Sequence, residues 1–391
     1  MQQLKQKNRK ARNRIKNQKI LIEVNIMKKI KIKKANTLLI AMMTVFAFLL
    51  TACGGGNEAA STKEGNDNKD SSEITDKPEM EELTLMGVRD AQISAAQIIA
   101  EKMGYFEEEG VKVTNHLIEN GPEMGSMIAG GSAPISLMSN FLAITLKSSD
   151  VPIKVVAVLD QMAGTQAMVG SKDLKLESAK DLEGLKIGMP NGAEVRYAIE
   201  SMGEELGVDV NKINFINIGP SDGLTALQRG DIDALAAWEP FITKGTQAGG
   251  EFILSGRKSN LPEKEGDVNW LSVHSTVMAT ESFLEENPNT IKALIRALKK
   301  ATDYINDNRE EAIKTLAPEL RLSESELTEI MSRNEYTMEV SDTYWKESNS
   351  DGIMDYFMSV GNIKSKPEVS SYHDFSLLKE VYPELITSDL E

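Results

Sequence analysis

The sequence predicts an α/β protein in which the chain from residue 83 onward forms two lobes. Three observations support this fold class. Apolar strands alternate with helical patterns over residues 83–159, the alternation begins again at Leu185, and an apolar strand at 272–279 returns the chain to the first unit. Such alternation is typical of α/β architecture, and the roughly 309 residues involved suffice for two domains of ordinary size.

Short apolar runs predict the strands of the first unit, and apolar side chains at helical spacing predict the helices between them. The strands are expected over residues 83–88, 111–113, 134–138 and 153–159. The helices are expected over residues 93–103, 124–128 and 141–146. The last of the four runs is apolar throughout, which is typical of a strand buried in a parallel sheet.

The second unit shows the same alternation, and the chain after it is mainly helical. Its strands are expected over residues 185–189, 213–218 and 232–236, and its helices over 195–206 and 221–228. Helices are then expected over 288–307, 309–316 and 323–333. Ser323 and Glu326 have the spacing of a capping box at the start of the last helix.

The N-terminal region reads as a secretory signal peptide. A cluster of lysines at 28–34 precedes an apolar run at 37–50, and small residues lead to Cys53. The apolar run has 14 residues, fewer than the roughly 20 that a membrane-spanning helix needs. Because the cysteine follows Leu-Thr-Ala, the segment resembles the lipobox of bacterial lipoproteins, which implies that Cys53 is lipidated. Residues 1–52 are therefore expected to be signal peptide plus upstream extension, with Met27 as an alternative start.

The composition of the remaining chain argues against several classes of function. Residues 1–52 carry 13 of the 44 basic residues and one of the 59 acidic ones, so the rest has 31 basic and 58 acidic residues and a net charge of about −27. Such a chain repels nucleic acid. Cys53 is the only cysteine, so neither a disulfide nor a thiolate metal site is expected. Residues 53–82 are polar after the cysteine and predict a flexible tether with a reach of roughly 30 Å.

Four segments of the body resemble a known family. They are residues 100–110 (AEKMGYFEEEG), 182–190 (LEGLKIGMP), 226–234 (ALQRGDIDA) and 238–241 (WEPF). In this order and spacing, they are similar to the substrate-binding lipoproteins of ABC importers that take up nitrate, sulfonates, taurine and thiamine-precursor pyrimidines. The resemblance extends from about residue 83 to the C-terminus.

This resemblance implies a periplasmic-binding-protein-like (type II) fold, with a hinge and a ligand cleft between the lobes. Lobe 1 would comprise residues 83–165 plus 273–391, and lobe 2 residues 166–272. The expected partners are a small solute, an ABC permease and its ATPase, and the membrane through the N-terminal lipid. The protein would be monomeric, without a cofactor, and anchored outside the cytoplasm of a bacterium, which is expected to be Gram-positive.

Candidate ligand contacts lie where strands lead into helices, because ligands of open α/β sheets bind beyond the carboxyl ends of strands. Helix N-termini there offer N–H groups that suit anions. The three junctions supply Arg89, Asp90, Gln92, Ser139, Asn140, Asn191, Gly192, Ala193 and Glu194. Helix capping is the alternative role for Asp90 and for the pair Ser139 and Asn140.

Five further candidates complete the predicted site: Thr165, Gln166, Tyr197, Trp238 and Glu239. Trp238 could equally belong to the core, and Glu239 could bind a ligand cation or form a salt bridge beside the hinge. The third junction departs from the family pattern, in which a small hydroxyl residue often follows the glycine, because Ala193 and then Glu194 follow Gly192 here. Glu194 could satisfy the helix dipole, pair with Arg196, or bind an amine or another polar donor of the ligand. A carboxylate here competes with an anionic ligand, which favours a zwitterion or a neutral heterocycle. Arg89 and Arg196 are the cations expected to serve any anion.

Enzymatic functions fit the sequence less well than solute binding. The three histidines lie on different predicted elements without metal-ligand spacing, and no nucleophile elbow or phosphate loop is present. A pyrimidine synthase resembles this family but needs a cysteine-rich iron site, which a chain without cysteine after Cys53 lacks. A secreted hydrolase would need a general base near a nucleophile, and no such arrangement stands out in this sequence. A lipoprotein that presents its solute to a membrane sensor remains an alternative to import.

Overall fold

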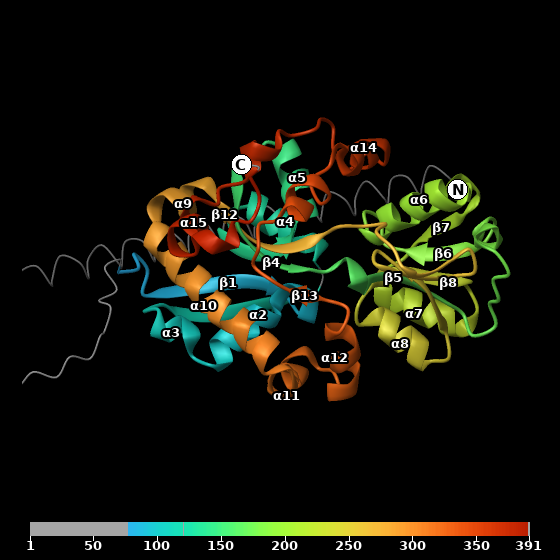
Figure 1. Cartoon of the computed structure of the whole chain (residues 1–391), viewed down its shortest axis with the longest axis horizontal. Helices are drawn as coiled ribbons and strands as arrows, with labels where there is room; N and C mark the ends of the chain where they lie inside the picture. The colour runs from blue at the N-terminus through green and yellow to red at the C-terminus, as the bar shows by residue number, and fades with distance from the viewer. Residues whose placement is uncertain (1–76, 120, 390–391) are drawn as a thin grey trace, which may run out of the picture. The chain divides into compact units, whose positions relative to one another are not determined.

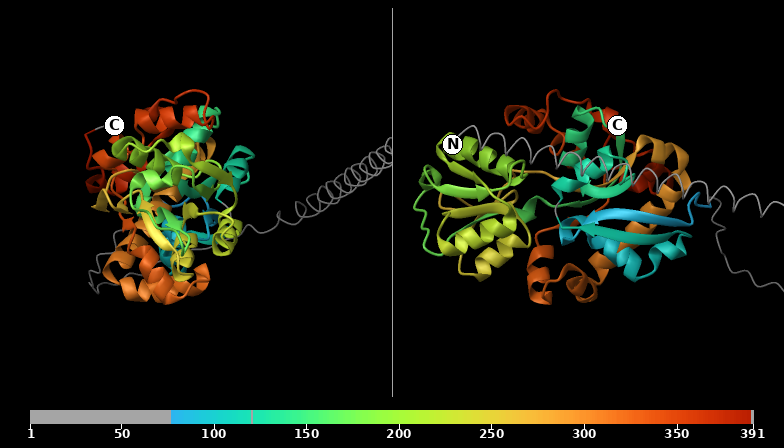
Figure 2. Two further views of the ribbon diagram at one scale, coloured as in Figure 1. Left: turned by 90° about the vertical axis from the view of Figure 1, so that its right-hand side faces the viewer. Right: turned by 180° about the vertical axis from the view of Figure 1, so that it is seen from behind.

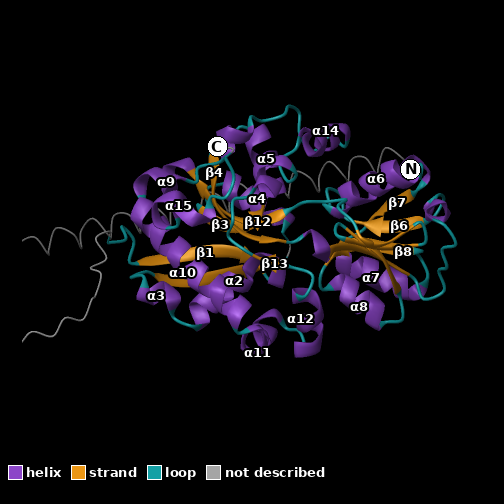
Figure 3. Ribbon diagram, in the orientation of Figure 1, coloured by secondary structure: helices purple, strands orange, loops and turns teal. Residues whose placement is uncertain are grey.

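The computed structural model describes residues 77–119 and 121–389. The predicted signal peptide, Met27, Cys53 and most of the predicted tether lie outside the described residues. No helix in the described ranges is long and apolar enough to cross a membrane. Figure 3 shows the described part as two β-sheets with helices against their faces.

The first sheet has the strand order β13-β4-β12-β3-β1-β2. Its strands are β1 (Glu82–Val88), β2 (Lys112–Ile118), β3 (Ile135–Ser139), β4 (Ile153–Gln161), β12 (His274–Thr280) and β13 (Glu335–Tyr336). β1 runs parallel to β2 and β3, whereas β12 runs antiparallel to β3 and β4. The predicted return of the chain near residues 272–279 is thus a strand of the first sheet.

The second sheet has the strand order β11-β10-β9-β5-β8-β6-β7. Its strands are β5 (Gln166–Gly170), β6 (Lys186–Met189), β7 (Asn214–Asn217), β8 (Ala234–Trp238), β9 (Glu251–Ser255), β10 (Lys258–Leu261) and β11 (Lys264–Asp267). β6 is parallel to β7 and β8, and β5 pairs antiparallel with β8 and β9. We call the first sheet with its helices lobe 1, and the second sheet with its helices lobe 2.

Helices cover both faces of each sheet (Figure 1). In lobe 2, α7 and α8 lie on one face and α6 on the other, as the view from behind in Figure 2 also shows. In lobe 1, α10 packs on α2 and α3 over one face, and α5 lies over the other. The bounds of these helices are α2 Ala91–Lys102, α3 Tyr105–Glu108, α5 Asn140–Ser148, α6 Val195–Leu206, α7 Pro220–Arg229, α8 Phe241–Gln247 and α10 Pro288–Asp307.

The remaining helices belong to lobe 1. They are α4 Pro122–Ala129, α9 Glu281–Glu286, α11 Arg309–Leu320, α12 Glu324–Met331, α13 Asp342–Lys346, α14 Asp351–Ser359 and α15 Ser376–Val381. The capping box predicted at Ser323 and Glu326 is present at the start of α12. The strongly amphipathic α10 buries its apolar stripe, which includes Ile291, Leu294 and Leu298, against α2 and the first sheet.

Two expectations from the sequence need correction. The apolar run that becomes β4 does not lie in a parallel sheet, because both of its neighbours, β12 and β13, run antiparallel to it. It is apolar throughout because helices cover both faces of the sheet, and every β4 residue but one is buried. The predicted tether also ends earlier than residue 82. The Glu79 carboxylate accepts hydrogen bonds from the backbone N–H groups of Asn289 and Thr290, which ties this segment to α10.

The two sheets are joined where the chain leaves β4 and enters β5 through the short turn Ala163–Thr165. Gly164 lies so close to the end of α12 that a Cβ atom there would be 2.3 Å from the carbonyl oxygen of Arg333. A return segment, residues 268–273, leads from β11 back to β12. The chain therefore crosses between the sheets beside the C-terminal end of α12.

We expect Gly164→Ala to destabilise the fold by about 1–3 kcal/mol, because the new methyl group must displace backbone rather than a flexible side chain. Urea unfolding at neutral pH measures the change. Gly219→Ala is the matched control, since nothing lies within 4 Å of a Cβ atom there. Equal stability of the two variants would contradict the tight contact at Gly164.

Candidate functional site

A cavity of about 310 Å³ is lined by residues of both lobes. Lobe 1 contributes the junctions that follow β1 and β3, and lobe 2 contributes those that follow β6 and β8. Nine of the fourteen predicted ligand residues line it: Asp90, Gln92, Ser139, Gln166, Asn191, Gly192, Ala193, Glu194 and Trp238. The structure thus brings together most of what the sequence pointed to at the carboxyl ends of strands.

On the lobe 1 side, Asp90 begins α2. Its Oδ1 accepts a hydrogen bond of 2.8 Å from the backbone N–H of Ile93, so the capping role considered for it is real. The residue also lines the cavity, and the two roles coexist. Ser139 begins α5 without a side-chain cap bond. Its hydroxyl lies near the Glu194 carboxyl of lobe 2 and lowers the pKa of that group.

On the lobe 2 side, the turn after β6 presents Asn191, Gly192, Ala193 and Glu194 to the cavity. Gly192 has φ of +77°, a conformation that other residues adopt only with strain. Glu194 precedes α6 without capping it. Arg196 is not its partner, because that guanidinium bonds the Glu200 carboxylate at 2.6 Å and lies 3.7 Å above the Phe215 ring. The Glu194 carboxyl can therefore interact with a molecule in the cavity.

The two cavity carboxyls have raised pKa values. Burial raises the pKa of Asp90 to about 7, and the nearby Glu194 charge adds to this shift while the bonds from Ile93 and Gln92 oppose it. Burial likewise raises the pKa of Glu194 to about 7, against the Ser139 hydroxyl. Perturbed carboxyls in a cleft are a recognised mark of functional sites.

Apolar side chains form most of the remaining wall, including Met138, Phe141, Met162, Trp238 and Phe357. The rings of Phe141 and Phe357 meet edge to face with their centroids 5.0 Å apart. Sequence reasoning missed Phe141, Phe357 and Asn362. Phe357 and Asn362 come from α14 and the turn after it, far along the chain, where no motif marks a ligand contact.

Five predicted ligand residues lie outside the cavity lining and have partners of their own. Arg89 pairs with Glu119 at 2.8 Å, and the Asn140 amide bonds Ser348 and the backbone of His274. The Thr165 hydroxyl donates to the Met162 carbonyl within its own turn. The Tyr197 ring packs against Tyr356 of α14. Glu239, the fifth, forms the salt bridge that was its alternative role.

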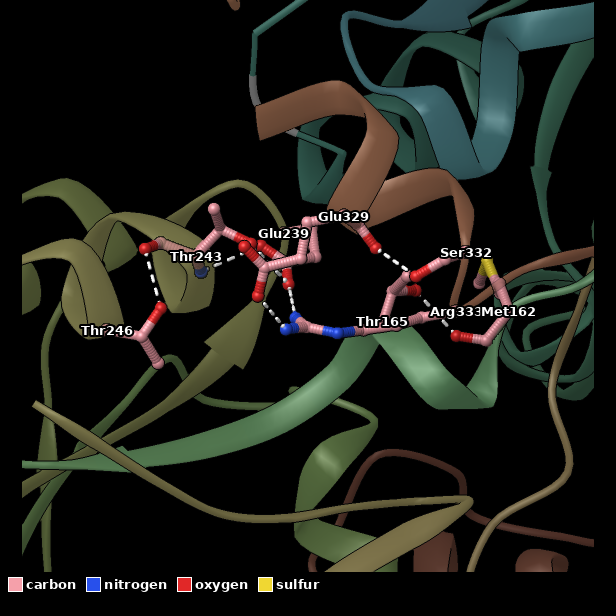
Figure 4. Close-up of polar contacts among 8 residues, drawn as sticks. All are labelled: Met162, Thr165, Glu239, Thr243, Thr246, Glu329, Ser332 and Arg333. Carbon is pink, nitrogen blue, oxygen red and sulfur yellow. Dashed lines mark hydrogen bonds and ion pairs between the residues drawn. The ribbon is translucent and has the colours of Figure 1, made fainter. Parts of the chain in front are cut away.

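The Glu239 carboxylate of lobe 2 bonds the Arg333 guanidinium of lobe 1, and we call this pair the interlobe salt bridge (Figure 4). Glu239 is only 1% exposed, and Thr243 donates to it from both its backbone N–H and its hydroxyl. Arg333 also bonds Glu329 at 2.5 Å. Despite these partners, burial keeps the pKa of Glu239 above its ordinary value.

The histidines of the described chain do not line the cavity. His274 Nδ1 bonds the Ser348 hydroxyl and His373 Nε2 bonds the Tyr344 hydroxyl, each at 2.7 Å. Burial lowers the pKa of both to about 3, so both imidazoles are neutral at physiological pH. Within residues 77–119 and 121–389, no group of three or more His, Cys, Asp or Glu side chains is placed to hold a metal ion.

Two mixed α/β lobes with a cavity between them define the architecture of the periplasmic binding proteins. The profile of the family described as "NMT1/THI5 like" matches residues 93–312, more than half of the chain. The chain belongs to the NMT1/THI5-like family.

Relatives of known name support the same assignment. A Bacillus subtilis protein named for binding aliphatic sulfonates is 21% identical over 358 residues, covering 90% of this chain and 98% of that protein. The formylaminopyrimidine-binding protein of Halalkalibacterium halodurans is 23% identical over 227 residues, covering 56% of this chain and 64% of that protein.

Solved structures share the fold. The periplasmic aliphatic sulphonate binding protein SsuA of Escherichia coli superposes with a TM-score of 0.64 at 18% identity, covering 75% of this chain and 97% of that one. The desulfurization enzyme DszB superposes with a TM-score of 0.57 at 13% identity, covering 77% of this chain and 99% of that one. The architecture therefore serves both binding proteins and an enzyme.

We expect Arg333→Met to destabilise the protein by about 3–5 kcal/mol at pH 7, because it leaves Glu239 buried without a countercharge. The loss should shrink at pH 5, where Glu239 can take up a proton. Adding Glu239→Gln to Arg333→Met should recover much of the stability, and the double-mutant cycle in urea measures the coupling. Arg229→Met on the exposed end of α7 is the control. Additive losses in the cycle would contradict the coupling.

We expect Glu194→Gln to change the pH dependence of stability. Since the folded pKa of Glu194 is raised to about 7, the folded protein keeps a proton that the unfolded chain releases from about pH 4.5 upward. Wild-type stability should fall relative to the variant as pH rises from 4.5 to 7, and then level off. The expected change is about 1–3 kcal/mol, since the side chain is only partly buried. Urea unfolding from pH 4 to 8 measures it.

Glu204→Gln, on the exposed face of the same helix, is the matched control for this substitution. A stability difference between wild type and Glu194→Gln that is the same at pH 4 and pH 8 would show that Glu194 titrates normally in the folded protein.

Proposed function

We propose that this protein is the solute-binding component of an ABC importer, which captures a small polar organic solute between its lobes and delivers it to a membrane permease. The observation that carries the proposal is the cavity, to which both lobes contribute polar groups from the ends of strands. Ligand sites are typically apolar clefts of about 300–1,000 Å³ with a few placed polar groups, and this one agrees in size and character.

The connection between the lobes supports capture by closure. Two short segments join the sheets, and hinge residues of this kind absorb the rotation when two lobes close on a ligand. The Tyr197–Tyr356 ring contact crosses between the lobes beside the cavity, where Ser139 of lobe 1 also lies near Glu194 of lobe 2. These contacts would form or break as the cleft closes or opens, and the interlobe salt bridge would hold the lobes together near the crossing.

Localisation and partners follow from the same proposal. The predicted lipid on Cys53 would hold the body outside the cytoplasmic membrane, and the predicted tether would let it reach a permease. Residues 83–165 plus 273–391 would move as one lobe and residues 166–272 as the other. The sequence expectation of a monomer belongs to this proposal as well.

The solute classes suggested by the family are sulfonates such as taurine, nitrate, and thiamine-precursor pyrimidines. The names of the relatives span two of these classes, since one is named for aliphatic sulfonates and another for formylaminopyrimidine. A cavity of about 310 Å³ with aromatic and methionine walls suits an organic solute better than nitrate. Nitrate is therefore the least favoured of the three solute classes.

An enzyme is the second candidate, because DszB has the same architecture. The cavity favours binding over catalysis. Its described lining holds neither a cysteine nor a histidine, and its one serine, Ser139, has the Glu194 carboxyl nearby rather than an imidazole. A solute sensor would use the same cavity and differ only in its membrane partner.

Trp238 provides a direct test of solute capture. It lines the cavity, whereas the other two tryptophans, Trp270 and Trp345, do not. The solutes to be tested are sulfonates, taurine, pyrimidines and amino acids. We expect a solute that binds to change the tryptophan fluorescence in a saturable manner. Trp238→Phe should abolish most of that change, because the reporting ring is gone.

Trp345→Phe, in the aromatic cluster with His373 and Phe375, is the control and should retain the fluorescence change. The same solute should stabilise the protein by about 2.7 kcal/mol at a hundred times its dissociation constant. Loss of this gene, or of a neighbouring permease gene, should abolish uptake of the solute by cells. Uptake that persists without this protein would favour sensing over import, and turnover of the solute would favour the enzyme.

A further inference from the structure

The cavity presents acceptors from both lobes and no cation. Asp90 of lobe 1 and Glu194 of lobe 2 both line it, and they are close enough that the charge of one raises the pKa of the other. None of the described lining residues is Lys, Arg or His. The two arginines that the sequence offered to an anion, Arg89 and Arg196, are paired with glutamates elsewhere.

Gln92 adds a third acceptor, by an independent observation. It lines the cavity and is only 3% exposed. Its side chain lies near the Asp90 carboxyl and lowers the pKa of that group. Its Oε1 has no hydrogen-bond partner among the described residues. Buried acceptors without partners are costly, so this oxygen is a place for a donor from outside the protein.

We propose that the solute is a flat apolar ring with one edge carrying a positive charge or N–H donors, and that Asp90 and Glu194 hold this edge between the two lobes. This inference rests on the proposed function and names the chemical class of its solute. The ring would lie against Phe141, Phe357 and Trp238, and the Gln92 oxygen would accept a further N–H.

An anion fits this cavity poorly. The N-termini of α2 and α6 would attract one, but at each of them a carboxyl already lies in the cavity. A sulfonate would therefore meet two like charges, or two protonated acids, without an opposing cation. A cation or amidine-like edge gains from both carboxylates, since charge-assisted hydrogen bonds are about twice as strong as neutral ones.

Binding of a cation should depend on pH. The charges of Asp90, Glu194, Asp160 and Tyr336 lie near enough to influence one another through Asp90, and Ser139 lies near Glu194. At pH 6 most of the Asp90 and Glu194 carboxyls hold a proton, and at pH 8 most have lost it. A solute that stays positively charged over this range should bind about tenfold more tightly at pH 8 than at pH 6, and its binding at pH 7 should release protons.

The test uses three probes of equal size on the full-length protein: benzamidine, benzamide and benzoate. Benzamidine is a planar cation from pH 6 to 8, benzamide is its neutral counterpart and benzoate its anionic one. Calorimetric titration gives affinity and proton release together. We expect benzamidine to bind at least tenfold more tightly than the other two, and to bind more tightly at pH 8 than at pH 6.

Two variants locate the probe. Glu194→Gln and Asp90→Asn should each weaken benzamidine binding at pH 8 by tenfold or more, and Glu204→Gln on the same helix as Glu194 should not. Because substitution of a capping residue can disturb folding, the result for Asp90→Asn counts only if its thermal unfolding stays cooperative. Glu194 does not cap its helix, so Glu194→Gln provides the independent variant.

The outcomes separate this inference from the proposed function. Benzoate or a sulfonate that binds as tightly as benzamidine would overturn the cation class while leaving solute capture intact. So would benzamidine affinity that is unchanged by Glu194→Gln and flat from pH 6 to 8. Failure of the three probes, together with failure of every solute in the earlier panel to alter Trp238 fluorescence, would count against both.

Discussion

A carboxyl group taken out of water must find a positive partner or take up a proton, and this constraint shapes the region where the two lobes meet. Glu239, Asp90 and Glu194 illustrate this constraint. Glu239 is paired with Arg333 and accepts two hydrogen bonds from Thr243, and these partners favour its ionised form while burial raises its pKa. Asp90 and Glu194 have no Lys, Arg or His beside them in the described cavity lining, and burial raises their pKa values to about 7. Glu239 and Arg333 form an ion pair between the lobes, whereas Asp90 and Glu194 would, under our proposal, find their positive partner in a ligand.

Much of this arrangement could be predicted from the sequence. Runs of apolar residues at strand and helix spacing predicted most of the elements from β1 to β8, because these elements bury apolar side chains in the core, but α3 and β5 were missed. The three strand-to-helix junctions could be found because polar residues follow apolar strands at a fixed edge of the sheet. Seven of the nine predicted residues that line the cavity come from these junctions, and the other two are Gln166 and Trp238.

The remaining strands and cavity residues could not be predicted from the sequence, for physical reasons. The strands β9 to β11 are short and half polar, since they form the exposed edge of the second sheet, so their periodicity is weak. Phe357 and Asn362 reach the cavity from a helix near the C-terminus, and only the tertiary fold brings them there. Asn140 looked like Ser139 in sequence, yet its amide faces inward to Ser348 rather than toward the cavity. Neighbouring positions at a helix start point in different directions, and spacing alone does not tell which.

Fold and function separate clearly in this architecture, because SsuA and DszB superpose on the same lobes. What distinguishes a binding protein is the energetic relation between its cleft and its hinge. The cavity of this chain holds two carboxyls that repel each other when ionised, so, if the lobes close as we propose, the empty protein would gain little from closing on them. A cation between them would reverse that balance, since each lobe would then attract the ligand and, through it, the other lobe. Because a ligand shifts a conformational equilibrium only by its differential affinity for the two states, one carboxyl on each lobe would make closure depend on the solute that fills the space between them.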